Sequence, residues 1–157
     1  GITGEELSKM MIDSHKFLLD DFLKGGDISP EHHLSTVATI PQIRMTRRIA
    51  GEYTLDDVEM HKHFDDSIGM CGDWRKSGPV YEIPFRTLHG KKVKNLIAAG
   101  RCISVTDPMW DISRVIPVCA VTGEAAGAAA ALGDDFTTLD VKMLQESLKK
   151  AGVLLFE

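Results

Sequence analysis

Residues 95–132 carry the pattern that decides the fold, and they read NLIAAGRCISVTDPMWDISRVIPVCAVTGEAAGAAAAL. The run 96–99 is short, continuous and apolar and ends at Gly100, which is typical of a buried parallel strand that turns sharply. Pro117 then opens the small-residue segment 118–132, which predicts a closely packed helix because proline is favoured in a first helical turn. The stretch is therefore expected to form a strand, a loop and a helix.

This arrangement would create a site for an electron-rich group. The free backbone N–H groups at a helix start and the helix dipole both favour negative charge. Gly100 would let the main chain approach a ligand, Arg101 could donate to a phosphate or a ring oxygen, and the amides of residues 118–120 would lie at the helix start. The alternative is that Gly100 merely ends a strand and the alanine-rich helix is only core. A close neighbouring backbone is expected on the helix face that carries Gly123, Gly127 and Ala130.

The rest of the chain mixes helical and strand-like patterns. Apolar residues at steps of three and four predict a long helix over 5–23, and T-x-x-D signatures predict helices over 54–62 and 139–150. Residues rich in Thr, Val and Ile predict extended segments. These extended segments are expected at 35–45, 48–55 and 81–88, with an irregular loop at 63–77.

Composition limits the classes of function. The 157 residues are 43% hydrophobic and carry 23 acidic against 18 basic side chains, a net charge of -5, so one compact unit is expected and nucleic acid and anionic membranes are not expected partners. No stretch approaches the roughly 20 apolar residues of a membrane span, and residues 1–6 lack a signal-peptide pattern, so we expect a cytoplasmic protein. Three widely spaced cysteines fit neither a disulfide framework nor a metal knuckle.

Several blocks together resemble the C-terminal part of a bacterial family of FAD-dependent oxidoreductases. The resemblance extends over about residues 40–132 and keeps the order of the blocks. The blocks read RMTRRIAGEY (44–53), YEIPFR (81–86), NLIAAGRCIS (95–104), RVIPVC (114–119) and TGEAAGAAA (122–130).

The resemblance implies that the Gly-Arg turn lies against the ribityl and pyrophosphate parts of FAD, and that the following helix points its N-terminus at the pyrimidine edge of the flavin. The positions implied to contact FAD are Gly100, Arg101, Val118, Cys119 and Ala120. The implied fold is α+β. Residues 1–92 would be a substrate or cap-domain portion with an N-terminal helix, and 93–157 would supply the last strand and helix of a Rossmann-like FAD-binding domain.

One feature of that family is missing from these 157 residues. Full-length members begin with a strand, a GxGxxG turn and a helix that hold the ADP half of FAD, and no such glycine spacing occurs here. We therefore expect a C-terminal fragment that binds FAD weakly or not at all alone, lacks autonomous catalysis, and needs an N-terminal half or another chain. An exposed apolar face could then drive homo-oligomerisation. The alternative is a non-catalytic binding or assembly module that has lost flavin.

Other side chains have weaker patterns. A guanidinium clamp for a substrate carboxylate could be formed by Arg44, Arg47, Arg48 and Arg86, although exposed or paired arginines are the plainer interpretation. Metal-ligand residue types gather at His61, His63, Asp65, Asp66 and Cys71, but their spacing matches no metal site, and we predict a solvated loop and no metal. His63 or Asp66 could also donate a proton near the flavin. The pattern identifies no catalytic residue, substrate, or electron donor and acceptor.

Overall fold

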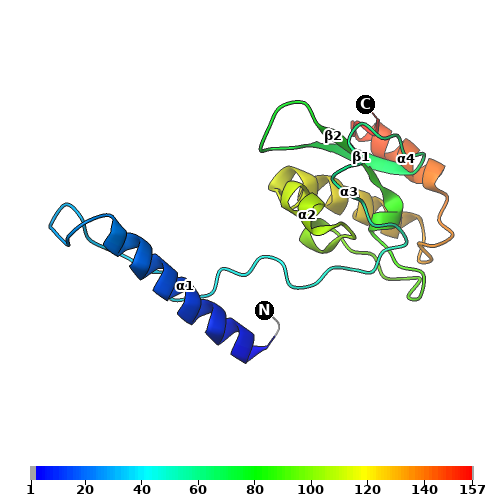
Figure 1. The fold of residues 1–157 in the computed structure, drawn as a ribbon. Helices are drawn as coiled ribbons and strands as arrows, with labels where there is room; N and C mark the ends of the chain where they lie inside the picture. The colour runs from blue at the N-terminus through cyan, green and yellow to red at the C-terminus, as the bar shows by residue number, and fades with distance from the viewer. Residues whose placement is uncertain (1–2, 157) are drawn as a thin grey trace. The chain divides into compact units, whose positions relative to one another are not determined.

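The computed structural model describes residues 3–156, and the chain divides into two compact units, Gly1–Thr46 and Arg47–Glu157 (Figure 1). The division falls between residues 46 and 47. The assignment of 1–92 to a cap-domain portion and of 93–157 to an FAD-binding portion stays a prediction. The mixture of helices and an antiparallel sheet agrees with the expected α+β class. The elements are α1 (Gly4–Lys24), β1 (Ser67–Gly72), β2 (Val80–Pro84), α2 (Asp107–Ser113), α3 (Ile116–Leu132) and α4 (Val141–Lys150), with 3-10 turns at Phe85–Thr87 and Gly100–Cys102.

The first unit is built on α1, which confirms the helix predicted over 5–23. A capping box starts it: Glu6 N–H donates to Thr3 Oγ1 at 3.2 Å and Thr3 N–H donates to Glu6 Oε2 at 3.1 Å. The His32 ring stacks on Phe22 with centroids 4.5 Å apart. No described residue of α1 is buried, so its apolar side chains have little protein cover within this unit.

The strand predicted over 35–45 is wrong, because residues 35–45 have no strand structure. A β-strand needs a neighbouring strand for its N–H and C=O groups, and no segment of the described chain pairs with these residues. A hydrogen bond at 2.8 Å joins this stretch to α1, between His15 Nε2 and the Ala38 carbonyl. The Thr, Val and Ile content of this segment predicted a strand, but without a partner strand the segment joins no sheet.

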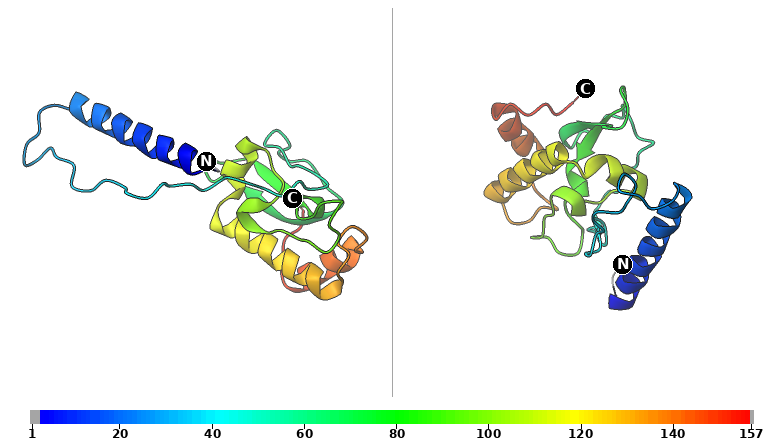
Figure 2. Two further views of the ribbon diagram at one scale, coloured as in Figure 1. Left: turned by 90° about the horizontal axis from the view of Figure 1, so that it is seen from below. Right: turned by 90° about the vertical axis from the view of Figure 1, so that its left-hand side faces the viewer.

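The antiparallel hairpin of β1 and β2 lies in the core of the second unit, together with apolar side chains of α2, α3 and α4. Cys71 lies opposite Tyr81, and the register is interrupted between Ser67 and Met70. Gly69 lies in this irregularity with φ +152°, and a Cβ there would lie 2.4 Å from Val121 Cγ1 of α3. Helices α3 and α4 pack against β1 and against each other, as two further views also show (Figure 2).

The prediction of an irregular loop over 63–77 is wrong in part, because strand β1 lies within these residues. Ser67, Ile68, Gly69 and Cys71 are all buried, so neighbouring residues of this strand do not alternate between core and solvent. The bulge at Gly69 shifts the alternation further. A strand buried on both faces has no period of two to detect in the sequence.

Three other expected elements are reduced in the structure. The strand predicted over 48–55 is reduced to one bridge between Leu55 and Val105, and residues 54–62 form turns in place of a helix. The buried strand expected over 96–99 is also absent: Ile97 forms one antiparallel bridge to His89, and Leu96 is 51% exposed. A parallel strand needs parallel neighbours, and the described residues contain none.

The segments 118–132 and 139–150 are confirmed as helices, α3 and α4. Residues 81–88 are extended only as far as Pro84 and then form the 3-10 turn Phe85–Thr87. Within residues 3–156, no single helix is long and apolar enough to cross a membrane; α2 and α3, which are bent by 92°, pass that test only as a pair, by length and composition.

Candidate functional site

The turn at Gly100 is fixed directly to helix α3. Gly100 has φ +72°, a left-handed conformation that favours glycine, and its N–H donates to Thr122 Oγ1 at 2.9 Å. The Thr122 hydroxyl in turn donates to the Val118 carbonyl at 2.8 Å. A Cβ at Gly100 would lie 3.5 Å from Cys119 Sγ, so the turn already lies close to the first turns of α3.

The N-terminus of α3 has no side-chain cap. Val115 is the N-cap residue and makes no side-chain hydrogen bond, and Pro117 has no N–H to donate. The Cys119 N–H makes a backbone bond to the Val115 carbonyl, at 3.1 Å, whereas the amides of Ile116 and Val118 lie too early in the helix for an intrahelical acceptor. Ile116 is 84% exposed, so this positive helix end reaches the surface of its unit.

Arg101 follows Gly100 and has an exposed side chain. Its carbonyl accepts a hydrogen bond from Trp110 Nε1 at 3.1 Å, and within residues 3–156 its guanidinium makes no hydrogen bond or ion pair. The group is therefore available to an external acceptor such as a phosphate or a flavin oxygen.

The structure brings three of the five predicted FAD positions together, because Gly100 meets Cys119 and, through Thr122, Val118. The other two, Arg101 and Ala120, are exposed. A left-handed glycine, an uncapped helix start and an unpaired guanidinium are donors suited to a ligand rich in phosphate and ring oxygens. The chemistry of these donors fits FAD, and the individual contacts remain predictions.

Two of the four predicted substrate arginines already contact other side chains of the second unit. Arg86 forms a bidentate pair with Asp66, with Nε–Oδ2 and Nη2–Oδ1 distances of 2.9 and 3.0 Å, and this pairing raises the pKa of Arg86. Arg48 Nη1 donates to Ser104 Oγ at 3.1 Å. Arg44 belongs to the first unit and Arg47 begins the second. The clamp stays a prediction, and two of its members already have protein partners.

In the predicted solvated loop, His63 contacts two carboxylates. His63 Nδ1 lies 3.2 Å from Glu82 Oε2, and His63 Nε2 lies 3.5 Å from Asp65 Oδ1. Burial raises the pKa of the Cys71 thiol to about 12, which keeps it protonated at neutral pH. Within residues 3–156, no three or more His, Cys, Asp or Glu side chains are placed to hold a metal ion.

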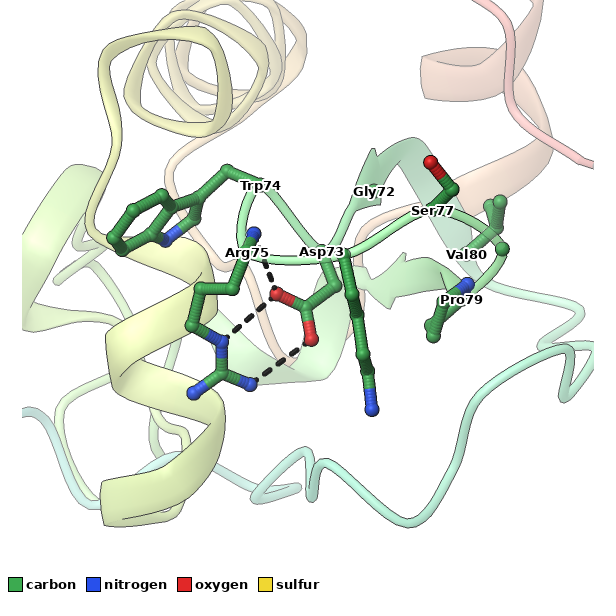
Figure 3. A pocket seen from close by; sticks show the side chains of 9 residues that line it. Gly72, Asp73, Trp74, Arg75, Ser77, Pro79 and Val80 are labelled. Atoms are coloured by element: carbon green, nitrogen blue, oxygen red, sulfur yellow. Dashed lines mark hydrogen bonds and ion pairs between the residues drawn. The ribbon is translucent and has the colours of Figure 1, made fainter.

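The hairpin loop between β1 and β2 holds a polar cluster that the sequence analysis did not identify (Figure 3). The buried Asp73 carboxylate accepts from Arg75 Nε and Nη2, both at 2.9 Å, and the Arg75 guanidinium lowers the pKa of Asp73 to about 2. The loop lines an open hollow of about 590 Å³ over residues 72–80. Gly72, Gly78 and Pro79 are the turn-forming residues that could have located this hairpin loop from the sequence.

The same loop contacts helix α2. Trp74 Nε1 donates to the Asp111 carbonyl at 2.9 Å, and Arg75 Nη1 donates to Asp111 Oδ2 at 3.1 Å. Arg114 Nε donates to Asp111 Oδ1 at 2.9 Å, and the two arginines lower the pKa of Asp111. Asp111 thus joins two segments that are more than thirty positions apart in sequence.

The chain is similar to a known protein family. A family model described as FAD dependent oxidoreductase matches residues 5–148, which is most of the chain. No curated protein and no solved structure matches the chain.

Proposed function

We propose, because the chain belongs to the FAD dependent oxidoreductase family, that it supplies the closing part of an FAD site. The observation that carries this proposal is the bond from Gly100 N–H to Thr122 Oγ1, at 2.9 Å. It fixes the left-handed turn against the first turns of α3, whose start is uncapped. This is the same segment that the sequence resemblance assigned to flavin.

Each part of this segment has a separate proposed role. Gly100 lets the backbone approach the cofactor, and Arg101 donates to a phosphate or ring oxygen. Val118 contributes an amide that has no intrahelical acceptor, and Cys119 and Ala120, which follow it at the positive end of α3, lie against the electron-rich edge of the flavin. FAD, when bound, supplies the redox chemistry, so these residues bind and orient and are not themselves oxidised or reduced.

A second polypeptide segment is proposed to complete the site. These 157 residues contain no GxGxxG turn, and α3 leaves Gly123 and Gly127 exposed with nothing within 4 Å of a Cβ placed on either. A segment that carries the ADP-binding half would cover this face and pair with residues 96–99, giving them the parallel strand neighbours of a Rossmann-like sheet. In its absence, we propose that the chain binds FAD weakly and does not catalyse a reaction.

A non-catalytic assembly module is the second candidate. It is favoured by α1, because no described residue of this helix is buried. Large apolar side chains lie open on it, with Phe17 70% exposed and Leu23 53% exposed. Such a module would use its uncovered apolar faces to bind another chain and would have no use for flavin. Flavin binding therefore separates the two candidates.

The experiment is a titration of FAD followed by flavin absorbance. The chain is tested alone and together with a polypeptide that supplies a GxGxxG unit. We expect weak binding alone, tight binding in the mixture, and a Kd about 10-fold or more higher for Arg101→Gln, because a hydrogen bond to a charged group is worth about 1.5–3 kcal/mol. Lys142→Gln, which removes an exposed positive charge in α4, is the matched control.

Gly100→Ala gives a second variant of the same site. Its φ of +72° disfavours any residue with a Cβ, so thermal unfolding of the variant is measured alongside FAD binding. Unchanged FAD binding in both Arg101→Gln and Gly100→Ala would refute the site. Absence of FAD binding in every mixture, with stable association of the two polypeptides, would favour the assembly module.

A further inference from the structure

The turn that carries Arg101 is held from a second side by helix α2. Trp110 lies half-buried in this helix, and its Nε1–H donates to the Arg101 carbonyl at 3.1 Å. The turn is also held by bonds from Gly100 N–H to Thr122 Oγ1, from Ile103 N–H to the Gly100 carbonyl at 3.4 Å, and from Ile49 N–H to the Cys102 carbonyl at 2.8 Å. The indole is thus the one side chain of the described residues that bonds the Arg101 peptide itself.

The indole of Trp110 is held in turn by Arg114. The guanidinium carbon of Arg114 lies 5.4 Å from the Trp110 ring centroid and 5.5 Å from that of Trp74, within cation–π range of both. Arg114 Nε is directed by Asp111 Oδ1 at 2.9 Å. The cation therefore joins the indole of α2 to the indole of the hairpin loop.

The hairpin loop fixes the far end of this chain of contacts. Trp74 and Arg75 both donate to Asp111. The Asp73 carboxylate holds the Arg75 guanidinium by two side-chain bonds (Figure 3). The Asp73 side chain is fully buried, so this end has a rigid base. Nothing in the proposed FAD site requires so many directional contacts at this loop.

We propose that Trp110 is a positioning residue for Arg101, and that the cluster of Asp73, Trp74, Arg75, Asp111 and Arg114 fixes the indole for this purpose. By holding the Arg101 carbonyl, the indole sets the direction in which the Arg101 side chain leaves the turn. The proposal rests on the proposed function, in which that side chain binds FAD. A residue that only packed would need no donor aimed at this carbonyl.

The first test needs no flavin. Hydrogen exchange of the Ile103 amide, which closes the turn, is measured by NMR relative to the Leu148 amide in α4. We expect Trp110→Phe to raise this ratio about 3- to 10-fold, the effect of one net hydrogen bond, because the ring remains and only the donor is lost. Asp111→Asn should raise it less. Tyr81→Phe, which removes the hydroxyl bonded to the Asp57 carbonyl, is the control and should leave the ratio unchanged.

The second test is a double-mutant cycle on FAD binding in the mixture with the GxGxxG polypeptide. Trp110→Phe should raise the Kd for FAD about 3- to 10-fold with Arg101 present and less than about 2-fold in Arg101→Gln, since the indole acts through that arginine. Equal factors in both backgrounds, or an unchanged Ile103 exchange ratio, would overturn the proposal. An unchanged Kd for FAD in Arg101→Gln would refute the proposed role of Arg101 in FAD binding. The exchange test does not involve FAD, so it separates that failure from a failure of the Trp110 proposal.

Discussion

Helices α3 and α4 lie against the same strand but are covered to different extents by this chain. Helix α4 buries Leu144 and Leu148 at 0% and 1% exposure and turns its lysines outward. Helix α3 also buries one face, and its opposite face is exposed and apolar apart from Glu124. The buried residues of α3 are Val118, Thr122, Ala125 and Ala129, and its exposed face carries Ile116, Ala120, Gly123, Gly127 and Ala131.

This difference in burial shows that the chain covers α4 as its sequence pattern requires, but covers α3 on one side. The pattern of α4 is that of a helix with one side in water, and its observed burial agrees with this. A helix with apolar residues on both faces is normally covered on both, and α3 is covered on one. Its small residues at 123 and 127 would allow a close neighbour, which supports the proposal that another segment packs there.

The largest effect is expected on the covered side. Leu148→Ala should lower the free energy of unfolding by about 2–5 kcal/mol, because it removes a fully buried side chain and leaves a cavity. Met143→Ala, on the exposed face of the same helix at 55% exposure, should change it by less than about 0.5 kcal/mol. Urea unfolding of both variants measures the difference. Similar losses in the two variants would mean that α4 is buried on both sides.

A smaller effect should separate the two faces of α3. Ala125→Leu should destabilise the chain by about 1–3 kcal/mol, since Ala125 is 0% exposed and the added atoms would overpack the core. Ala131→Leu, on the exposed face, should be neutral for the isolated chain and should weaken binding of a covering segment. Unfolding of each variant is compared with its affinity for the GxGxxG polypeptide. A destabilising Ala131→Leu would show that this face is already packed.

The same comparison explains which predictions from the sequence succeeded. Helices α1, α3 and α4 were predictable because their spacing and end signals are local. The strand over 96–99 was not, because its pattern calls for parallel neighbours that the described residues lack. Strand β1 was missed because both of its faces are buried.

The candidate site divides in the same way. Gly100, Val118 and Cys119 were predictable as a group from the motif and its resemblance, and the structure places them in one cluster. The Asp111 cluster was not predictable, because Trp74 and Arg75 reach it from more than thirty residues away and no local spacing encodes that contact.

A pH-dependent effect is expected at the hairpin loop, which belongs to the completed part of the fold. The folded pKa of Asp73 is about 2, below its ordinary value of 3.8, so its ion pair stabilises the fold above pH 4 and is lost as pH falls toward 2. Asp73→Asn should therefore lose stability at pH 7 and show a shallower fall between pH 4 and pH 2. Solvent screening of the half-exposed Arg75 keeps the effect below that of the core substitutions.

Urea unfolding across this pH range measures the Asp73 effect. Asp134→Asn, at an exposed carboxylate after α3, is the control and should leave the acid slope as in the wild type. An unchanged slope in Asp73→Asn would mean that the bonds from Arg75 do not persist in solution. The loop would then lack the internal contacts that distinguish it from the uncovered face of α3.

The smallest effect should have the opposite sign and lies at the centre of the uncovered face of α3. Gly127→Ala should stabilise the isolated chain by about 0.5–1 kcal/mol, because alanine is the better helix former and its Cβ would meet nothing within 4 Å. The same methyl group should weaken binding of the covering segment, since it would stand where that backbone approaches. Gly69→Ala is the contrasting control and should destabilise, because its Cβ would collide with Val121. If Gly127→Ala destabilised the isolated chain, the face would already be covered, by a second copy of the chain, and sedimentation at several concentrations would detect that dimer.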